Sequence, residues 1–262
     1  MISFTSAELY AWVSGFLWPL VRILGLMTAA PLLGHASVPA RVKIGLGVMI
    51  ALVVAPTVAD LPEIDPLSFS GLLIVAQQFV IGLAIGFAMR IIFAGVEMAG
   101  EIASLGMGLS FASFFDPQSR GVTTVLSRFL SYLALLVFLA LDGHLLLIAA
   151  LAKSFAVLPV SAAPLHADGF RQIAGWGGMV FSIGVQLSLP IVAAMLITNL
   201  ALGILTRAAP QLNVFSVGFP ITLAVGFAVL MITLPYLATP LVNLLHDGLD
   251  LAGKVAPALG GK

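Results

Sequence analysis

The chain has 262 residues, of which 61% are hydrophobic and only 8% charged, and its formal net charge is zero. Ordinary soluble domains carry about 25% charged residues, so this composition excludes a soluble globular core and indicates a helical integral membrane protein. The zero net charge gives no reason to expect nucleic acid as a partner. The absence of cysteine excludes disulfides, thiolate metal sites and thiol nucleophiles.

Six apolar regions follow one another along the sequence, and we predict that each forms a long helix. In chain order they are 10–33, 42–59, 67–93, 126–151, 173–206 and 214–245. A Gly-rich, weakly charged connector (94–128) separates the third region from the fourth, and a short tail (247–262) is expected to be frayed. The predicted fold class is all-α: a polytopic helical membrane protein of long, kinked helical hairpins.

The last two regions are longer than a bilayer requires. Arg171 and Arg207 bracket 35 consecutive uncharged residues, and 39 more follow in 208–246. A helix rises about 1.5 Å per residue and a bilayer core is about 30 Å thick, so about 20 residues suffice to cross it. We therefore expect these helices to tilt, to project beyond the lipid or to break. Prolines mark the expected breaks: Pro190, Pro220, Pro235 and Pro240.

Signatures of catalysis are absent from the sequence. It has no phosphate-binding G-x-x-x-x-G-K-[ST], no H-E-x-x-H and no G-x-S-x-G, so we expect neither enzyme activity nor a cofactor. Isolated histidines are more often simply hydrogen-bonded than metal ligands, and we expect no metal site. The histidines are scattered over separate loops or helix ends: His35, His144, His166 and His246.

Charged side chains within or beside apolar regions need a reason, because placing a charge in lipid is costly. Arg22 lies midway through the first region, where we favour a structural pairing with a carboxylate or a neighbouring subunit over a substrate or ion contact. Glu97 and Glu101 follow Arg90 and share a helix face one turn apart. Such a pair fits a helix that lines water or meets a basic partner, with a proton relay as the less favoured alternative.

Asp142 and His144 flank Gly143 near the end of the fourth region. Residues two apart do not share a helix face, so a turn or kink at this tripeptide is favoured over a relay. Small residues at four-residue spacing predict a helix-packing face elsewhere. They are Gly82 and Gly86, then Gly100, Ser104 and Gly108, and the second run merges with Gly106 and Met107 into a predicted closely packed helix end.

Three phenylalanines follow this helix end. Phe111, Phe114 and Phe115 precede Asp116 and Pro117, and the proline biases Asp116 away from helix, so we expect a loop. On these residues alone, an interfacial loop with aromatic rings among lipid headgroups is favoured. The alternative is an apolar constriction that closes a wet lumen by dewetting.

A helical hairpin is predicted where the last two apolar regions meet. Pro210 ends one helix, Asn213 can cap the next, and Gly218 with Pro220 bends its first turns. The predicted tip comprises Arg207, Pro210, Asn213, Phe215, Gly218, Phe219 and Pro220.

At these motifs the sequence resembles the FliR family of flagellar type III export-gate subunits, whose injectisome counterparts are the T-type export apparatus subunits. The residues that carry the resemblance are 101–117, the Asp142-Gly143-His144 turn and 207–220. The similarity extends over essentially the whole chain in length and in the order of its apolar segments. Family members often carry Asn where this chain has Asp142, so we assign no role to that position.

The resemblance implies a subunit of a protein-conducting pore in the bacterial inner membrane, at the flagellar basal body. In the family, one FliR assembles with five FliP and four FliQ in a helical ring, near FlhB and FlhA, and unfolded flagellar proteins pass through. Much of that ring stands above the usual membrane plane. The resemblance further implies a FliP-like part over 1–166, with a plug loop at 106–122, and a FliQ-like hairpin and tail over 167–262.

By the same match, the central loop plugs the closed pore, which reverses the preference for an interfacial loop. The plug and its hinges would be Gly106, Met107, Gly108, Phe111, Phe114, Phe115, Asp116 and Pro117. Glu97 and Glu101 would meet polar partner surfaces, and the hairpin tip would face the cytoplasm. The alternative function is an ion-coupled secondary transporter that uses Arg22, Glu97 and Glu101 and relates its two halves by an inverted repeat. An intramembrane hydrolase ranks third, because no serine is suitably placed with a histidine and an acid.

Overall fold

The structure, a computed structural model, describes residues 6–35, 37–58, 61–62, 64–109, 124–209 and 214–261, with the backbone alone at 6–14 and 214–216. The described residues contain helices and no strand, so the predicted all-α membrane fold is confirmed. Contacts divide the chain into two compact units. Unit 1 comprises Met1–Ile91, Phe138–Gly177 and Leu245–Lys262, and unit 2 comprises Ile92–Val137 and Gly178–Leu244.

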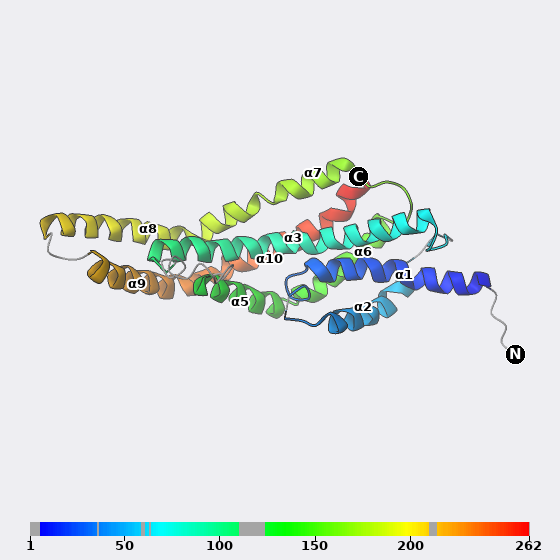
Figure 1. Cartoon of the computed structure of the whole chain (residues 1–262), viewed down its shortest axis with the longest axis horizontal. Helices are drawn as coiled ribbons and strands as arrows, with labels where there is room; N and C mark the ends of the chain where they lie inside the picture. The colour runs from blue at the N-terminus through cyan, green and yellow to red at the C-terminus, as the bar shows by residue number, and fades with distance from the viewer. Residues whose placement is uncertain are drawn as a thin grey trace. The chain divides into compact units, whose positions relative to one another are not determined.

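The helices follow the predicted apolar regions, with shifted ends and additional breaks (Figure 1). In chain order they are α1 (Ser6–Ala29), α2 (Ala40–Val54), α3 (Phe69–Met107), α5 (Val125–Ala140), α6 (Gly143–Val157), α7 (Ala167–Trp176), α8 (Met179–Ala208), α9 (Val214–Thr233) and α10 (Ala238–Gly260). Short 3₁₀ turns follow α2 and α9, at Ala55–Thr57 and Leu234–Leu237. Among the described residues, four helical stretches can cross a membrane by length and composition, or five if the bent α5–α6 pair counts as one span.

Unit 1 is built around the crossing of α1 and α3. Two glycines of α3 allow the backbones to approach closely, as their spacing predicted. A Cβ atom at Gly86 would lie 2.7 Å from the carbonyl oxygen of Leu26, and one at Gly82 would collide with the carbonyl oxygen of Arg22. Around this crossing α1 buries Trp18 and Ile23 completely.

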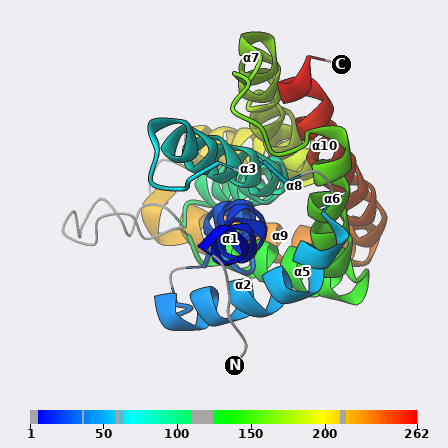
Figure 2. The same ribbon diagram turned by 90° about the vertical axis from the view of Figure 1, so that its right-hand side faces the viewer.

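The C-terminal end of the chain is part of the unit 1 core, so the expectation of a frayed tail is wrong. Helix α10 continues to Gly260, and Leu251, Val255 and Leu259 are buried. Figures 1 and 2 both show the end of α10 beside α7. The backbone N–H of His166, the residue before α7, donates to the carbonyl oxygen of Leu259 at 3.0 Å. Burial of this apolar face fixes the tail.

The fourth predicted region breaks at Asp142, which confirms the expected turn. Asp142 has a φ of 53°, in the left-handed region, and the helix restarts at Gly143 as α6. A Cβ atom at Gly143 would collide with the ring of Phe138. The break therefore rests on one residue that tolerates positive φ and on a neighbour without a side chain.

The prolines act differently from the prediction at two of four positions. Helix α8 continues through Pro190 and α9 through Pro220, so the expected breaks there are wrong. A single missing N–H removes one hydrogen bond, which the turns on either side of these long helices tolerate. At Pro235 the α-helix does give way to a 3₁₀ turn, and Pro240 occupies the first turn of α10.

Unit 2 packs the second half of α3 against α8, α9 and the start of α5. The prediction ended the third helix near Phe93, and this boundary is wrong because α3 continues to Met107. The intervening glycine at position 95 is a packing position: a Cβ atom there would lie 2.7 Å from Cβ of Ile183 in α8. Helices α8 and α9 form an antiparallel hairpin (Figure 1).

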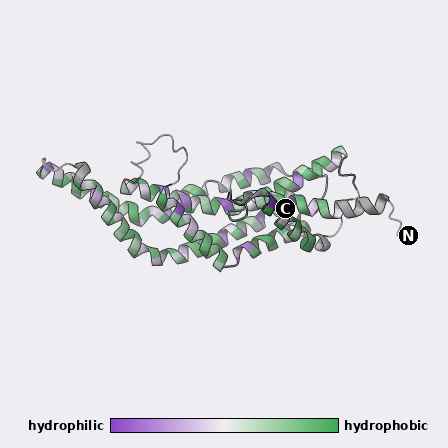
Figure 3. Ribbon diagram, turned by 60° about the horizontal axis from the view of Figure 1, so that its bottom comes forward, coloured by the Kyte–Doolittle hydropathy of each residue, from purple (hydrophilic) through white to green (hydrophobic). Residues whose placement is uncertain are grey.

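Helix α8 is apolar on all sides but buries only one of them. Its buried positions recur at helical spacing, which places them on one face: Ile183, Gly184, Ser188, Ile191 and Met195. The opposite face exposes Phe181, Val185, Leu189, Leu196, Ile197, Leu200 and Ile204. Hydrophobic residues likewise run along most of the helices in Figure 3. A helix that is hydrophobic all round needs lipid or another protein against its free side.

Candidate functional site

The candidate site lies in unit 2, where the chain leaves α3 and returns to α5. Helix α3 ends in a glycine cap, as the Gly106-Met107-Gly108 run predicted. Gly108 has a φ of 81°. Its N–H donates to the carbonyl oxygen of Leu105 at 3.1 Å, and the N–H of Leu109 donates to that of Ser104 at 3.0 Å. This pair of bonds is the Schellman motif, in which a left-handed glycine satisfies the last helical carbonyls.

Thr124 lies directly before α5. The carbonyl oxygen of Thr124 accepts from the N–H of Arg128 at 3.1 Å, and its Oγ1 accepts from the N–H of Ser127 at 3.3 Å. Thr124 therefore has the position and the bonds of an N-cap residue. Its own N–H donates to Oε1 of Glu101 at 2.9 Å, and its Oγ1 lies 2.8 Å from the hydroxyl of Ser104.

Glu101 is thus engaged by neutral donors rather than by a basic residue among the described parts of the chain. Besides Thr124, the Ser127 hydroxyl lies 3.0 Å from Glu101 Oε1 and 2.7 Å from the carbonyl oxygen of Glu97, so it shares one proton between them. The Glu97 side chain is half-buried, and Arg90 is exposed on the unit 1 half of α3. The roles predicted for Glu97 and Glu101 toward partner surfaces, and for Arg90 as an inter-subunit or buried charge, stay predictions.

Met107 is enclosed inside unit 2. Its side chain has no exposed surface, and Gly226 of α9 leaves the space that it occupies, since a Cβ atom at Gly226 would lie 2.7 Å from Cε of Met107. The hydroxyl of Thr222 shares its proton between the carbonyl oxygen of Met107, at 3.3 Å, and that of Phe219 in its own helix, at 3.0 Å. Helix α9 therefore holds the last residue of α3 by both its side chain and its backbone. Beside it, Gly106 is half-buried, next to Met195 of α8.

The remaining residues of the predicted plug lie outside the described residues: Phe111, Phe114, Phe115, Asp116 and Pro117. The same holds for Pro210 and Asn213 of the predicted hairpin tip and for the Phe215 side chain. The hairpin itself is present, since α8 ends at Ala208 and α9 begins at Val214. Arg207 is exposed in the last turn of α8, where a positive charge complements the helix dipole. On α9, Gly218 is buried, while Phe219 and Pro220 are exposed.

Arg22 forms a second polar cluster, in unit 1, and its side chain has no exposed surface. Nε donates to Oε1 of Gln78 at 2.7 Å, one terminal nitrogen donates to the Ser154 hydroxyl at 2.9 Å, and the other donates to the carbonyl oxygen of Leu158 at 2.9 Å. The guanidinium carbon also lies 4.0 Å from the centroid of the Phe155 ring. These partners are neutral groups in place of the expected carboxylate within the described chain, and the structural role of Arg22 stays a prediction.

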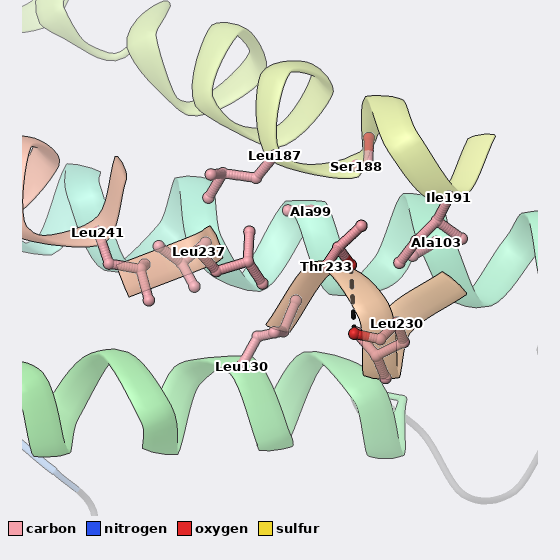
Figure 4. A pocket seen from close by; sticks show the side chains of 11 residues that line it. Ala99, Ala103, Leu130, Leu187, Ser188, Ile191, Leu230, Thr233, Leu237 and Leu241 are labelled. Carbon is pink, nitrogen blue, oxygen red and sulfur yellow. Dashed lines mark hydrogen bonds between the residues drawn. The ribbon is translucent and has the colours of Figure 1, made fainter. Parts of the chain in front are cut away.

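Two cavities within the described residues are smaller than a typical small-molecule site, which occupies about 300–1,000 Å³. Unit 2 encloses a gap of about 10 Å³ lined almost entirely by apolar side chains, with Ser188 and Thr233 as its polar members (Figure 4). The Thr233 hydroxyl donates to the carbonyl oxygens of Val229 and Leu230 in its own helix and not into the cavity. In unit 1, a cavity of about 120 Å³ lies beside Gln78 and Leu158. The described residues include no group of three or more histidines and carboxylates that could hold a metal ion.

Comparison with known proteins identifies the family. The model of the family described as bacterial export proteins, family 1, matches residues 13–248. The chain is 44% identical over 259 residues to the flagellar biosynthetic protein FliR of Pectobacterium carotovorum subsp. carotovorum, which covers 99% of each chain. The chain belongs to the FliR family of bacterial export proteins. It is also 42% identical over 254 residues to FliR of Escherichia coli K12, covering 94% of this chain and 97% of that protein. Identity to FliR of Bacillus subtilis is 34% over 220 residues, covering 83% and 85%.

Membership of the FliR family confirms the resemblance drawn from the sequence motifs. It makes the chain a membrane component of the flagellar export system and places it in a family of structural secretion components. The transporter alternative gains no support from the two polar clusters, because Arg22 donates to three groups of its own unit and Glu101 binds the start of α5.

Sequence reasoning missed the residues that complete both polar clusters. Gln78 follows Gln77, and Ser154 follows Lys153, in otherwise apolar runs, and no local pattern joins either residue to Arg22. Thr124 and Ser127 did carry a signal, because a threonine before an apolar run predicts a helix N-cap. That signal would have marked the start of α5, although not its bond to Glu101.

Proposed function

We propose that this FliR-family chain is a subunit of the flagellar type III export gate in the bacterial inner membrane, at the flagellar basal body. One copy would form the protein-conducting pore with five FliP and four FliQ subunits, next to FlhB and FlhA, for unfolded flagellar proteins. The similarity to FliR proteins over almost the whole chain carries this proposal. Residues 1–166 would be the FliP-like part, and 167–262 the FliQ-like hairpin and tail. The compact units are a different division, because segments of both parts contribute to each unit.

The exposed apolar surface of the helices supports an assembled state. In α3, 67% of the most apolar stretch is buried within the chain, against 28% for Ala167–Ala208 and 22% for Val217–Gly260. At 30 residues, α8 is roughly 45 Å long, while a bilayer core is about 30 Å thick. A single lipid-bathed helix would leave about a third of this apolar length in water. Partner subunits that pack along α8 and α9 would cover it.

Charged substitutions on the free face of α8 test the assembly. Leu196 and Leu200 are 66% and 67% exposed on the side away from the buried stripe. Replacing either with Lys should remove FliP and FliQ from the detergent-extracted particle, whose intact mass reports its composition. The matched Leu196→Met change keeps the apolar surface and should preserve the particle. A particle of unchanged mass with both Lys variants would contradict partner packing on this face.

We further propose that the segment after α3 plugs the closed pore, with Phe111, Phe114 and Phe115 sealing it by exclusion of water. Gly106 and Gly108 would let the segment move, and Asp116 with Pro117 would turn it. The left-handed cap at Gly108 and the N-cap at Thr124 support this proposal, because they give the segment defined ends on unit 2.

An ion-leak measurement tests the plug. Deletion of residues 110–116 should raise the ion conductance of the closed, partner-assembled complex, and changing the three phenylalanines to Ala should do so to a lesser degree. Phe69→Ala, at an 84% exposed phenylalanine at the start of α3, is the matched control. Unchanged conductance after the deletion would reject the plug.

A further inference from the structure

We propose that a pocket in unit 1 binds a small anionic group, such as a carboxylate, which the buried charge of Arg22 attracts and the amide of Gln77 binds by donation. The pocket has a volume of about 120 Å³ and is lined by α3, by the loop between α6 and α7, and by the end of α10. We call it the unit 1 pocket, because all of its lining residues belong to that unit. The proposal does not depend on the export function.

Gln77 brings a buried donor to the pocket wall. The residue is 9% exposed and lines the pocket. Its amide forms no hydrogen bond with the described residues, although they do not enclose it completely. Polar groups buried in proteins almost always have a hydrogen-bond partner. The Gln77 amide therefore indicates that something other than the described chain occupies the pocket.

The second amide of the wall has a defined orientation. Gln78 is 1% exposed, and its Oε1 accepts from Nε of Arg22 at 2.7 Å. The remaining polar group of this side chain is its NH₂, which can only donate. The other polar lining residues, Ser161 and His166, can donate as well, and the lining residues include no carboxylate. This wall suits a ligand that accepts hydrogen bonds and does not suit a cation.

Arg22 supplies the charge that selects an anion. Its side chain is fully buried and donates to neutral groups only, and the salt bridge found among the described residues joins Arg171 to Asp168 on the surface. Two of its acceptors, Gln78 and the carbonyl group of Leu158, belong to residues that also line the pocket. An anion there would lie close to a positive charge in a weakly screened environment, where opposite charges attract strongly.

The size of the pocket limits the ligand. One water molecule needs a cavity of about 10–15 Å³, so the pocket has room for several waters or for one small polar group. A typical small-molecule site is at least about twice as large. A carboxylate or an inorganic anion of similar size fits both the volume and the donors of the wall.

The same chemistry has two possible sources. One is the carboxylate side chain of a neighbouring protein in the assembled complex, and the other is a free anion from solution. Two measurements on the detergent-extracted complex, assembled with its partner subunits, distinguish them. Saturation-transfer NMR in a chloride-free buffer detects binding of formate, the smallest carboxylate with an observable proton. A cryo-electron microscopy map at side-chain resolution shows whether an Asp or Glu of another chain enters the pocket.

Gln77→Leu is the test variant. It replaces the amide by an apolar group of similar volume and leaves the three hydrogen bonds of Arg22 in place, so the fold should be kept. Loss of one hydrogen bond to a charged group should weaken formate binding about tenfold to a hundredfold. Gln172→Leu is the matched control, because Gln172 is an exposed glutamine of α7 in the same unit.

We expect one of two results. Saturation transfer to formate that is lost in Gln77→Leu and kept in Gln172→Leu supports a site for a free anion. Absence of transfer, together with density that joins a partner carboxylate to the Gln77 amide and leaves the pocket in Gln77→Leu, supports a partner side chain. Transfer that Gln77→Leu does not weaken would overturn the proposal. A pocket that holds only water in the map and shows no saturation transfer would overturn it as well.

Discussion

Nε of Arg22 on α1 and Oε1 of Gln78 on α3 are joined by a buried hydrogen bond of 2.7 Å across 56 positions of sequence. Ser154 and the carbonyl oxygen of Leu158 accept the other two bonds of the guanidinium. A buried charge costs several kcal/mol unless its donors are satisfied, and here dipoles of neutral groups supply the compensation. Arg22 therefore ties α1, α3 and α6 together within unit 1.

We predict that Arg22→Ala destabilises the protein by about 3 kcal/mol or more, because two buried acceptors and one partly buried acceptor lose their donor together. Ser154→Ala removes only one acceptor and should cost about 1 kcal/mol. Thermal unfolding of the purified, detergent-extracted complex measures both effects. Arg171→Ala is the control, since Arg171 pairs with Asp168 at 3.4 Å on an exposed surface, where ion pairs contribute little. Equal unfolding temperatures for Arg22→Ala and Arg171→Ala would contradict the structural role of Arg22.

A second prediction concerns two glycines in apolar helices. Gly82→Ala should destabilise the protein by several times the ~1 kcal/mol that Ala gains over Gly in a helix, because the new methyl group collides with the carbonyl oxygen of Arg22. A Cβ atom at Gly203 of α8 meets no atom within 4 Å, so Gly203→Ala should be neutral or slightly stabilising. Thermal unfolding of both variants compares the cost of a steric clash between two helix backbones with the stability that Ala gains over Gly in a helix. A stabilising Gly82→Ala would show that the α1–α3 crossing is looser than described.

The long apolar helices were predictable from composition, while the extent of α3 was not. Glycines and two glutamates made 94–107 resemble a connector. Gly95 and Gly100 are instead the positions where α8 and α5 approach α3, and this depends on contacts with residues far along the chain. In α10 the opposite holds. Leu251, Val255 and Leu259 recur at four-residue spacing. This pattern predicts a buried helix face, although the charged residues Asp250 and Lys254 lie beside and between them.

For the two polar clusters, the sequence predicted where the charged residues lie but not which residues they bind. Burial of Arg22 followed from its position in an apolar region, but its partners are 56 and 132 residues away, and no local pattern encodes such pairs. The pairing of Glu101 with Thr124 likewise needs the fold, because it depends on where the chain returns to α3. Local chemistry did fix Gly108 as a helix end and Asp142 as a turn. Both are positions where the backbone alone requires a particular residue type.

A third prediction tests the turn between α5 and α6. Asp142 has a φ of 53°, which Asn tolerates about as well and β-branched residues do not. Asp142→Asn should leave stability unchanged, whereas Asp142→Val should cost about 1–3 kcal/mol of backbone strain. The comparison uses thermal unfolding of the same complex. If Asn also destabilises the protein, the Asp142 carboxylate itself has a role that the turn does not explain.

The last prediction separates two roles of Met107. If Met107 packs only inside unit 2, Met107→Ala should leave a cavity beside Gly226 and cost about 2–5 kcal/mol, while Met107→Leu should cost less than about 1.5 kcal/mol. Thr222→Val removes the bond to the Met107 carbonyl oxygen and should cost about 1 kcal/mol. This variant tests the contact between the end of α3 and α9 from the α9 side. Thermal unfolding and closed-state ion conductance are measured together. A raised leak in Met107→Ala with unchanged stability would mean that this side chain seals the pore directly. Lowered stability with a leak in proportion would mean that it acts by holding the end of α3, and through it the segment that follows.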